Sequence, residues 1–369
     1  MSMRSNGPIS RRDFLRMVGL GSGVLALGGV AAACSSPTAP ASPTPAAAAG
    51  AAATSAATAQ PTQAAPAKGK TVRVAYSHGA GGTSEKAAND LVKYIADQTK
   101  GEYTVQVFPG GQLGGERDMA ESQQMGSIEI GWYGTFLIDN IAAEWGSIVD
   151  TPYVMRDVTH FRKVVDGPLF KPVYDAILQR KGIRHIGWSN RGPRYLTSNK
   201  AVTVPADVKG MKIRVPEYET YVAAWKMLGA TVVPMAFPEV FMALKQGTID
   251  SQENPLENAV NGSFYDVQKY VNLTGHIVSG YQLTVSDKWF QTLSPLLQKT
   301  FTDGILMLCE NQTKYQLEDE AQLEKTLKDK GMTFHEVDKP KFQEALKELP
   351  KQFAGTWESG FYEKVVAVQ

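Results

Sequence analysis

From about residue 71 to the end of the chain, short β-rich runs alternate with longer amphipathic segments, and this rhythm limits the folds open to the sequence. The run at 72–76, for example, is followed after a glycine-rich turn by a helical pattern with Ala87, Leu91 and Ile95 on one face. Strands that alternate with helices at this spacing are typical of βαβ units and predict an α/β fold. Because the pattern recurs in the second half, we expect two α/β lobes of comparable size, with mixed sheets flanked by helices.

The second half contains a long helical pattern and a turn between two strands. Beyond Ser294, apolar side chains keep a helical spacing to about Lys330, which predicts one long helix. Cys309 within it is most simply a buried small apolar residue. Further upstream, the pattern predicts a strand at 183–188, a turn at 190–195 and a further short strand that ends at Thr197.

Residues 1–33 have the form of an export signal. Arg11 and Arg12 stand before an uncharged stretch, residues 17–33, that ends in small side chains. The stretch is short and glycine-rich for a membrane span, so we expect a removable signal rather than an anchor helix. The sequence Ser-Arg-Arg-Asp-Phe-Leu resembles the twin-arginine signal, which bacteria use to export folded proteins.

Residues 34–69 are expected to tether a globular body to a membrane. Ala-Ala-Ala-Cys34 is similar to a lipoprotein cleavage box, in which the cysteine becomes the lipidated first residue of the mature chain. Residues 35–67 contain only Ser, Pro, Thr, Ala, Gly and Gln, and such a stretch cannot bury enough apolar surface to fold. We expect a periplasmic or cell-surface protein anchored through Cys34. The alternative is cleavage within the alanine run, with Cys34 an incidental thiol.

Charge and motif content exclude several classes of function. The 38 Lys and Arg nearly balance 37 Asp and Glu, and the one basic cluster lies in the export signal, so we expect no nucleic-acid partner. Cys34 and Cys309 are the only cysteines, which excludes a disulfide framework. The five histidines have no metal-ligand spacing, and neither a Gly-x-Ser-x-Gly elbow nor a Walker loop occurs. We therefore expect no metal and no cofactor.

Two arginines lie at expected strand ends. Arg214 comes just before Pro216 stops a short strand, and ligands bind at the carboxyl ends of strands in open α/β sheets. Arg194 lies in the turn at 190–195. A guanidinium presents a planar fork that matches a carboxylate, so the pair could select organic anions. From spacing alone, a surface salt bridge is the competing interpretation.

Longer motifs around these arginines closely resemble the solute-binding proteins of tripartite ATP-independent periplasmic (TRAP) transporters. They include residues 209–216 (KGMKIRVP), 233–240 (VPMAFPEV) and 249–255 (IDSQENP), and the similarity extends over nearly all of 71–369. The resemblance implies a non-enzymatic receptor of two lobes, with a ligand cleft between them and a long helix spanning both. It also implies a monomer that closes on a small organic acid and delivers it to integral membrane subunits.

The resemblance places crossings between the lobes near Arg191, Ser279 and Asp319. It therefore divides the body into lobe I, residues 70–191 plus 280–319, and lobe II, residues 192–279 plus 320–369. A ligand favours the closed form only if it contacts both lobes.

In lobe II, the resemblance implies that Arg214 holds the ligand carboxylate. Arg194 and Asn254 match further contacts of the pocket, and Phe237 matches an apolar or aromatic wall. Asn254 could also cap the helix that begins near Pro255.

In lobe I, the resemblance implies that Glu116 is an acid near the ligand, and its alternative role is as a dipole partner of a helix N-terminus. Ser77, Trp132 and Tyr133 occupy loops that vary with the substrate, although the two aromatic residues could instead pack in the core. His78 is expected to be a loop residue.

Fold alone does not fix function, so two other classes compete with a receptor. One is an exported, lipid-tethered enzyme or assembly factor on the same scaffold. The other is a tethered structural or interaction protein, which would show no ligand-dependent stabilisation.

Overall fold

The computed structural model describes residues 69–369. The predicted export signal, Cys34 and the tether up to residue 68 lie outside the described residues. Within residues 69–369, none of the helices is long and apolar enough to cross a bilayer.

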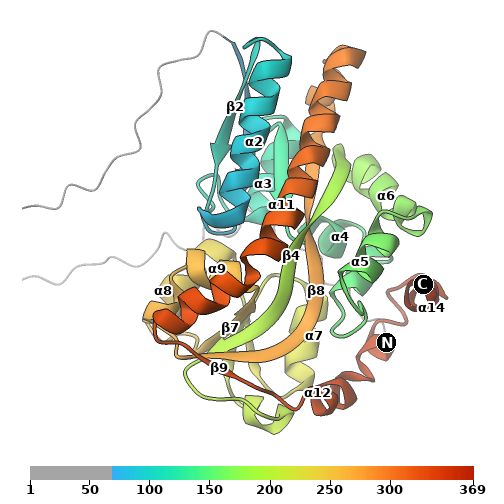
Figure 1. Ribbon diagram of the computed structural model, residues 1–369. Helices are drawn as coiled ribbons and strands as arrows, with labels where there is room; N and C mark the ends of the chain where they lie inside the picture. Colours follow the sequence, from blue (N-terminus) through green and yellow to red (C-terminus); the bar gives the residue numbers. More distant parts are fainter. Residues whose placement is uncertain (1–68) are drawn as a thin grey trace, which may run out of the picture. The chain divides into compact units, whose positions relative to one another are not determined.

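Nine strands in this part of the chain form one continuous sheet, in the order β2-β1-β3-β8-β4-β7-β5-β6, with β9 paired to β8 (Figure 1). The strands are β1 (Lys70–Tyr76), β2 (Tyr103–Phe108), β3 (Ile130–Tyr133), β4 (Ile183–Ser198), β5 (Lys212–Val215), β6 (Thr231–Pro234), β7 (Ser251–Asn254), β8 (Tyr270–Ser286) and β9 (Thr333–His335). β1 pairs in parallel with β2 and β3, and β5 pairs in parallel with β6 and β7. Two parallel sets are thus joined through the antiparallel pair β4 and β8.

Helices cover both parallel sets, as the alternating pattern predicted. The helices are α2 (Gly82–Gln98), α3 (Glu116–Met125), α4 (Phe136–Ile141), α5 (Val158–Val165), α6 (Lys171–Lys181), α7 (Glu219–Met227), α8 (Val240–Lys245), α9 (Leu256–Asn261), α10 (Asp287–Phe290), α11 (Pro295–Asp329), α12 (Lys339–Leu346), α13 (Leu349–Gln352) and α14 (Phe361–Ala367). In Figure 1, α2 and α3 accompany β1 to β3, whereas α7, α8 and α9 accompany β7 at the other end of β4 and β8.

The long helix α11 confirms the prediction made from residues 294–330. Ser294 begins it as the N-cap, where its side chain accepts a hydrogen bond from Leu297 N at 3.4 Å. Ile305 and Cys309 pack in an apolar cluster with β1 and α2. Leu327, near the other end, packs in a second cluster with α8 and α9. One helix therefore contributes to the cores of both lobes.

The predicted turn at 190–195 is wrong. β4 continues through it as a single strand of 16 residues, paired along its length with β8. Its register against β8 shifts between Asn190 and Pro193 and again between Arg194 and Leu196. Gly192, with φ of 79°, and Pro193 therefore mark a bulge rather than a reversal of the chain.

The C-terminal segment extends from α12, beside α7, to α14, beside α5 (Figure 1). Trp357 Nε1 donates to Ser147 Oγ at 2.7 Å, and Arg156 Nη1 donates to the carbonyl of Val366 at 3.0 Å. The lobe boundaries stay predictions, but this part of residues 320–369 contacts residues that the prediction assigned to lobe I.

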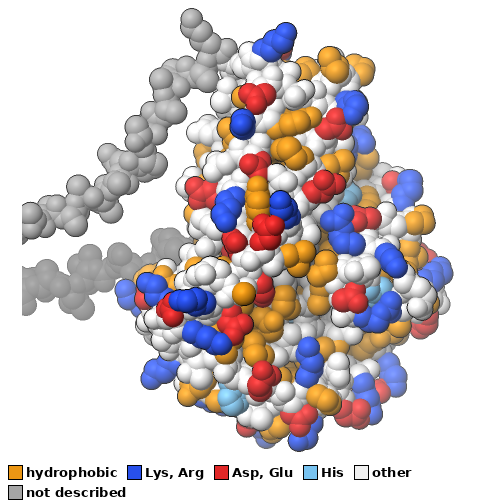
Figure 2. All heavy atoms as spheres, in the orientation of Figure 1, with side chains coloured by type: hydrophobic (Ala, Val, Ile, Leu, Met, Phe, Trp, Pro, Cys, Tyr) orange, Lys and Arg blue, Asp and Glu red, His pale blue; other side chains and the backbone are white. Residues whose placement is uncertain are grey.

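The face of the protein drawn in Figure 2 carries Lys and Arg side chains interspersed with Asp and Glu. This mixture agrees with the near balance of the two charges in the sequence. Single exposed leucines also occur along α11, among them Leu296 and Leu317.

Candidate functional site

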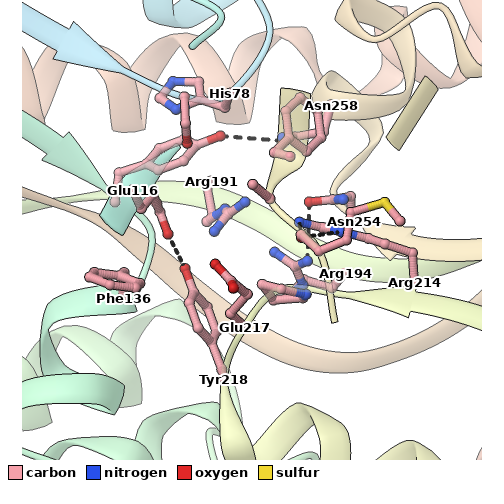
Figure 3. A pocket seen from close by; sticks show the side chains of 16 residues that line it. His78, Glu116, Phe136, Arg191, Arg194, Arg214, Glu217, Tyr218, Asn254 and Asn258 are labelled. Carbon is pink, nitrogen blue, oxygen red and sulfur yellow. Dashed lines mark hydrogen bonds between the residues drawn. The ribbon is translucent and has the colours of Figure 1, made fainter. Parts of the chain in front are cut away.

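A cavity with an empty volume of about 520 Å³, including its open mouth, lies where the two parallel strand sets face each other (Figure 3). Ser77 and His78 after β1, Glu116 at the start of α3 and Phe136 in α4 line it from predicted lobe I. From predicted lobe II it is lined by the ends of β5 and β7, by the loop at 216–218 and by the loop at 235–237. The cavity therefore brings together segments that are far apart in the sequence.

Arg194 is buried in the wall of the cavity and is already neutralised. Its Nε and Nη2 donate to the two carboxylate oxygens of Glu253 at 2.6 and 2.7 Å, and His276 Nε2 lies 3.0 Å from Glu253 Oε2. Burial lowers the pKa of Arg194, but the Glu253 carboxylate outweighs it and the pKa is raised. For Glu253, burial raises the pKa, but the charge of Arg194 and the hydrogen bonds from Arg194 and His276 together outweigh burial and hold the pKa at about 2. The pair is thus permanently ionised at neutral pH.

Arg214 is equally buried but has no carboxylate partner among residues 69–369. Its Nε and Nη2 donate to the carbonyl oxygen of Met235 at 2.9 and 2.6 Å. Burial lowers the pKa of Arg214 to about 10, while the charge of Glu253 acts in the opposite direction. The guanidinium remains charged at neutral pH, and the Met235 carbonyl fixes its plane without neutralising it.

Asn254 and Phe237 complete this end of the cavity. Asn254 Oδ1 accepts from Arg194 Nη2 at 3.1 Å, and its Nδ2 donates to Gln252 Oε1 at 2.6 Å. No side-chain cap is formed at the start of α9, so the alternative role of Asn254 as a helix cap is not observed. The ring centroid of Phe237 lies 5.9 Å from Arg214 Cζ. We call Arg194, Arg214 and Asn254 the carboxylate end.

Glu116 connects predicted lobes I and II across the cavity. One carboxylate oxygen accepts from Gly134 N, and the other accepts from the Tyr218 hydroxyl. The cap of α3 is made instead by Asp118, which accepts from Gly115 N at 2.9 Å. Glu116 therefore lines the cavity and does not cap the helix.

A second carboxylate joins the two sides close to the cavity. Glu257, in the first turn of α9, accepts hydrogen bonds from Thr83 N and Thr83 Oγ1, each at 2.8 Å, and from Ser84 N at 3.2 Å. These donors belong to the first turn of α2, where a carboxylate is favoured by the helix dipole. Together with the hydrogen bond between Tyr218 and Glu116, these contacts link residues of predicted lobes I and II around the cavity.

The loop after β1 contributes more than predicted. Ser77 lines the cavity, as expected, and so does His78, which the sequence indicated only as a loop residue. The His78 ring is stacked between Tyr76 and Tyr281, with centroid distances of 4.4 and 4.1 Å. Burial and the nearby charge of Arg191 hold the pKa of His78 well below its usual value, so the ring is neutral.

Trp132 and Tyr133 are not among the residues that line the cavity, so of the two roles left open for them the structure shows packing in the core. β3 lies between β1 and β8, and all four of its residues are buried. Trp132 packs edge-on against His78, and the Tyr133 hydroxyl donates to Gln123 Oε1 at 3.0 Å. Both are core residues, and Trp132 contacts the cavity only indirectly, through the ring of His78.

Several cavity residues were missed by the sequence reasoning, namely Phe136, Arg191, Glu217, Tyr218, Asn258 and Tyr281. Arg191 is the most informative of them. It stands three residues before Arg194, and in a regular strand that spacing puts two side chains on opposite faces. The extra residue of β4 between Asn190 and Pro193 changes the alternation and brings both guanidiniums to the cavity. A bulge at the Gly-Pro pair was the one signal that could have indicated it.

Within residues 69–369, no group of three His, Cys, Asp or Glu side chains could hold a metal ion. The cavity instead presents three guanidiniums, two side-chain amides and several hydroxyl groups. This set of donors suits an oxygen-rich anion.

Comparison with known proteins agrees with this geometry. Residues 74–356 match the family model described as bacterial extracellular solute-binding protein, family 7. A solute-binding protein of Verminephrobacter eiseniae is 33% identical over 308 residues, which cover 83% of this chain and 91% of the relative.

Two solved structures of TRAP periplasmic solute-binding proteins have closely similar folds. The protein from Polaromonas sp. JS666, bound to D-erythronate, is 32% identical and superposes with a TM-score of 0.76 over 81% of this chain and 99% of that one. The protein from Roseobacter denitrificans, with bound L-galactonate, is 32% identical with a TM-score of 0.74 over 81% and 98% of the two chains. The fold is therefore the two-domain α/β fold of periplasmic binding proteins, and the chain belongs to family 7 of the bacterial extracellular solute-binding proteins, whose members are receptors rather than enzymes.

Proposed function

We propose that this protein is an extracytoplasmic receptor that captures a small organic acid by its carboxylate and delivers it to the membrane subunits of a TRAP transporter. Arg214 is the anchor of the carboxylate, Arg194 and Asn254 orient it, and Phe237 forms the apolar wall beside it. Glu116 and Ser77 contact the ligand from the opposite side.

The observation that carries this proposal is the different pairing of the two buried arginines. Arg194 is neutralised by Glu253, whereas Arg214 is held only by a neutral carbonyl. A buried guanidinium without a counter-ion is costly, and a ligand carboxylate removes that cost by forming charge-assisted hydrogen bonds. The relatives with bound D-erythronate and L-galactonate support an acid as the ligand.

We also propose how the protein is exported and anchored to the membrane. Export through the twin-arginine pathway, followed by lipidation of Cys34, leaves the receptor at the membrane surface as a monomer on the tether of residues 34–69. Substituting Cys34 by Ala should release the protein from the membrane fraction, and replacing both Arg11 and Arg12 by Lys should stop export. Cell fractionation measures both outcomes.

Thermal denaturation of the mature protein against a panel of small organic acids tests the receptor function. A bound acid at about 100 times its dissociation constant stabilises the folded state by about 2.7 kcal/mol. We expect a selective rise in melting temperature with one class of acids. If no sugar acid, keto acid or dicarboxylate in the panel raises the melting temperature, the receptor function is contradicted. A tethered interaction protein would then be the better interpretation.

A further inference from the structure

Arg191 is a third guanidinium at the cavity, and it forms no ion pair within residues 69–369. The side chain is 6% exposed, and among residues 69–369 no carboxylate forms an ion pair with it. Its Nε is buried without a hydrogen-bond acceptor in the described residues. Its Cζ lies 4.4 Å from the centroid of the Tyr281 ring, which holds the guanidinium in place by a cation-π contact.

Asn258 presents a second unused donor at the same cavity. Its Oδ1 accepts a hydrogen bond from the Tyr281 hydroxyl at 3.3 Å, so the orientation of the amide is fixed. Its Nδ2 is buried and has no acceptor within residues 69–369. Burial raises the pKa of Tyr281 to about 12, so its hydroxyl stays protonated and remains a donor. Tyr281 thus organises both Arg191 and Asn258, which we call the distal donor pair.

The acidic residues of the cavity do not satisfy the distal donor pair. One carboxylate oxygen of Glu116 accepts from Gly134 N and the other from the Tyr218 hydroxyl, and Glu116 forms no ion pair with Arg191. Glu217 also lines the cavity, but the residue is exposed and forms no ion pair with Arg191. In Figure 3, Arg191 lies between Glu116 and the carboxylate end. Two buried donors that point to one cavity require an acceptor that the described residues do not supply.

We propose that Arg191 and Asn258 read a second oxygen acceptor of the ligand, a keto or carboxylate oxygen at the end away from the carboxylate that Arg214 holds. This inference rests on the proposed function and narrows its substrate class to acids with a keto or carboxylate oxygen at the second end. Arginine has only donors, and Asn258 offers its amide nitrogen, so an alkyl end leaves both buried donors unpaired.

Calorimetric titration with matched acids tests this inference. The probes are butanoate, 4-hydroxybutanoate, 4-oxobutanoate and succinate, together with the six-carbon series hexanoate, 6-hydroxyhexanoate, 6-oxohexanoate and adipate. Within at least one series, we expect the oxo-ended or carboxylate-ended acid to bind about tenfold to about hundredfold more tightly than the methyl-ended acid. Comparing the oxo-ended acids with the dicarboxylates shows whether the natural ligand presents a carbonyl or a second carboxylate to these donors.

Variants separate the distal donor pair from the carboxylate end. Arg191→Met should reduce the preference for the oxygenated end to less than about threefold, because the variant lacks the guanidinium that distinguishes an oxygenated end from a methyl end. Tyr281→Phe keeps the ring beneath Arg191 but removes the hydroxyl that orients Asn258, so it should lose part of the preference. Arg191→Lys keeps the charge without the fork and should fall between the wild type and Arg191→Met. Thermal melts show that each variant is folded.

The outcomes distinguish failure of this inference from failure of the proposed function. Equal affinity of the wild type for methyl-ended and oxygen-ended acids overturns the inference, as does a preference for hydroxyl-ended over both oxo-ended and carboxylate-ended acids. An unchanged preference in Arg191→Met overturns it too, and all three results leave the receptor function intact. If no acid in either series or in the wider panel binds, the proposed function fails and the inference fails with it.

Discussion

The carboxylate end and the distal donor pair differ in how their buried donors are balanced. At the carboxylate end, Arg194 is matched by Glu253, and a carbonyl fixes Arg214. At the distal donor pair, an aromatic ring and a phenol hydroxyl orient the donors but supply no acceptor to them. Arg194 and Glu253 therefore form a permanent internal network, whereas Arg214 gains a counter-ion, and the distal donor pair its acceptors, only from a ligand. Stability and selectivity therefore depend on different residues of one cavity.

Breaking the internal network should have the largest effect. Glu253→Gln leaves Arg194 buried without a counter-ion, and we expect a loss of about 3–5 kcal/mol in the free energy of unfolding. Urea denaturation followed by circular dichroism measures it. Glu121→Gln, at an exposed position of α3, is the matched control and should be neutral. A loss below about 1 kcal/mol would show that the pair is dispensable for stability.

Removing the unmatched guanidinium should affect binding and spare the fold. Arg214→Ala should weaken acid binding about hundredfold or more, since a buried charged hydrogen-bond partner contributes about 2–5 kcal/mol. Arg214→Lys should bind weakly, because an ammonium cannot reproduce the fork. Lys212→Ala, an exposed position on the same strand, serves as the control. Near-native affinity of Arg214→Ala in a calorimetric titration would contradict its role as the anchor.

The ionised pair at the carboxylate end also predicts a pH dependence. Because the pKa of Glu253 is about 2 in the folded protein, against 4.5 for an ordinary glutamate, the folded state binds fewer protons than the unfolded state between these values. The stability that Glu253 provides is complete above pH 4.5 and is lost as the pH falls through about 2. The difference in stability between the wild type and Glu253→Gln should therefore shrink on acidification. A difference that stays constant from pH 6 to pH 3 would show that Glu253 acts without its charge.

The smallest effect is expected at the contact that joins α9 to α2. Glu257→Gln keeps an acceptor for Thr83 and Ser84 but removes the charge that favours the helix N-terminus. We expect acid binding to weaken by about threefold to about tenfold, with the preference among acids unchanged, since only closure is affected. Titration of the same acids measures it, and Glu121→Gln again provides the control. A changed preference among the acids would show that Glu257 contributes to ligand recognition rather than to closure.

The local sequence pattern predicted features that depend on a single helix or strand. The alternation of strands and helices, the long helix from Ser294 and the position of Arg214 before Pro216 each depend on residues close in the sequence. Pattern failed where a residue depended on its neighbours in the sheet. Trp132 and Tyr133 stand at the end of a strand, as expected, but β1 and β8 flank that strand and bury both faces of it.

Arg191 and Asn258 were missed for a related reason. Arg191 reaches the cavity only because β4 carries an extra residue against β8, and pairing between strands 90 residues apart is not visible in a local pattern. The amide of Asn258 is oriented by a hydrogen bond from Tyr281, which lies on β8. Residue type alone could not have separated Arg191 from the other arginines of the chain.

The bulged course of β4 has a mechanical consequence. β4 and β8 are shared by both lobes, so opening the cavity requires these two strands to bend. A strand bends most easily where its ladder is interrupted, and β4 is interrupted on either side of Pro193 and Arg194. Arg191 and Arg194 are carried by this compliant stretch. We therefore expect a change in the curvature of β4 to move both guanidiniums together and to alter ligand binding at the same time.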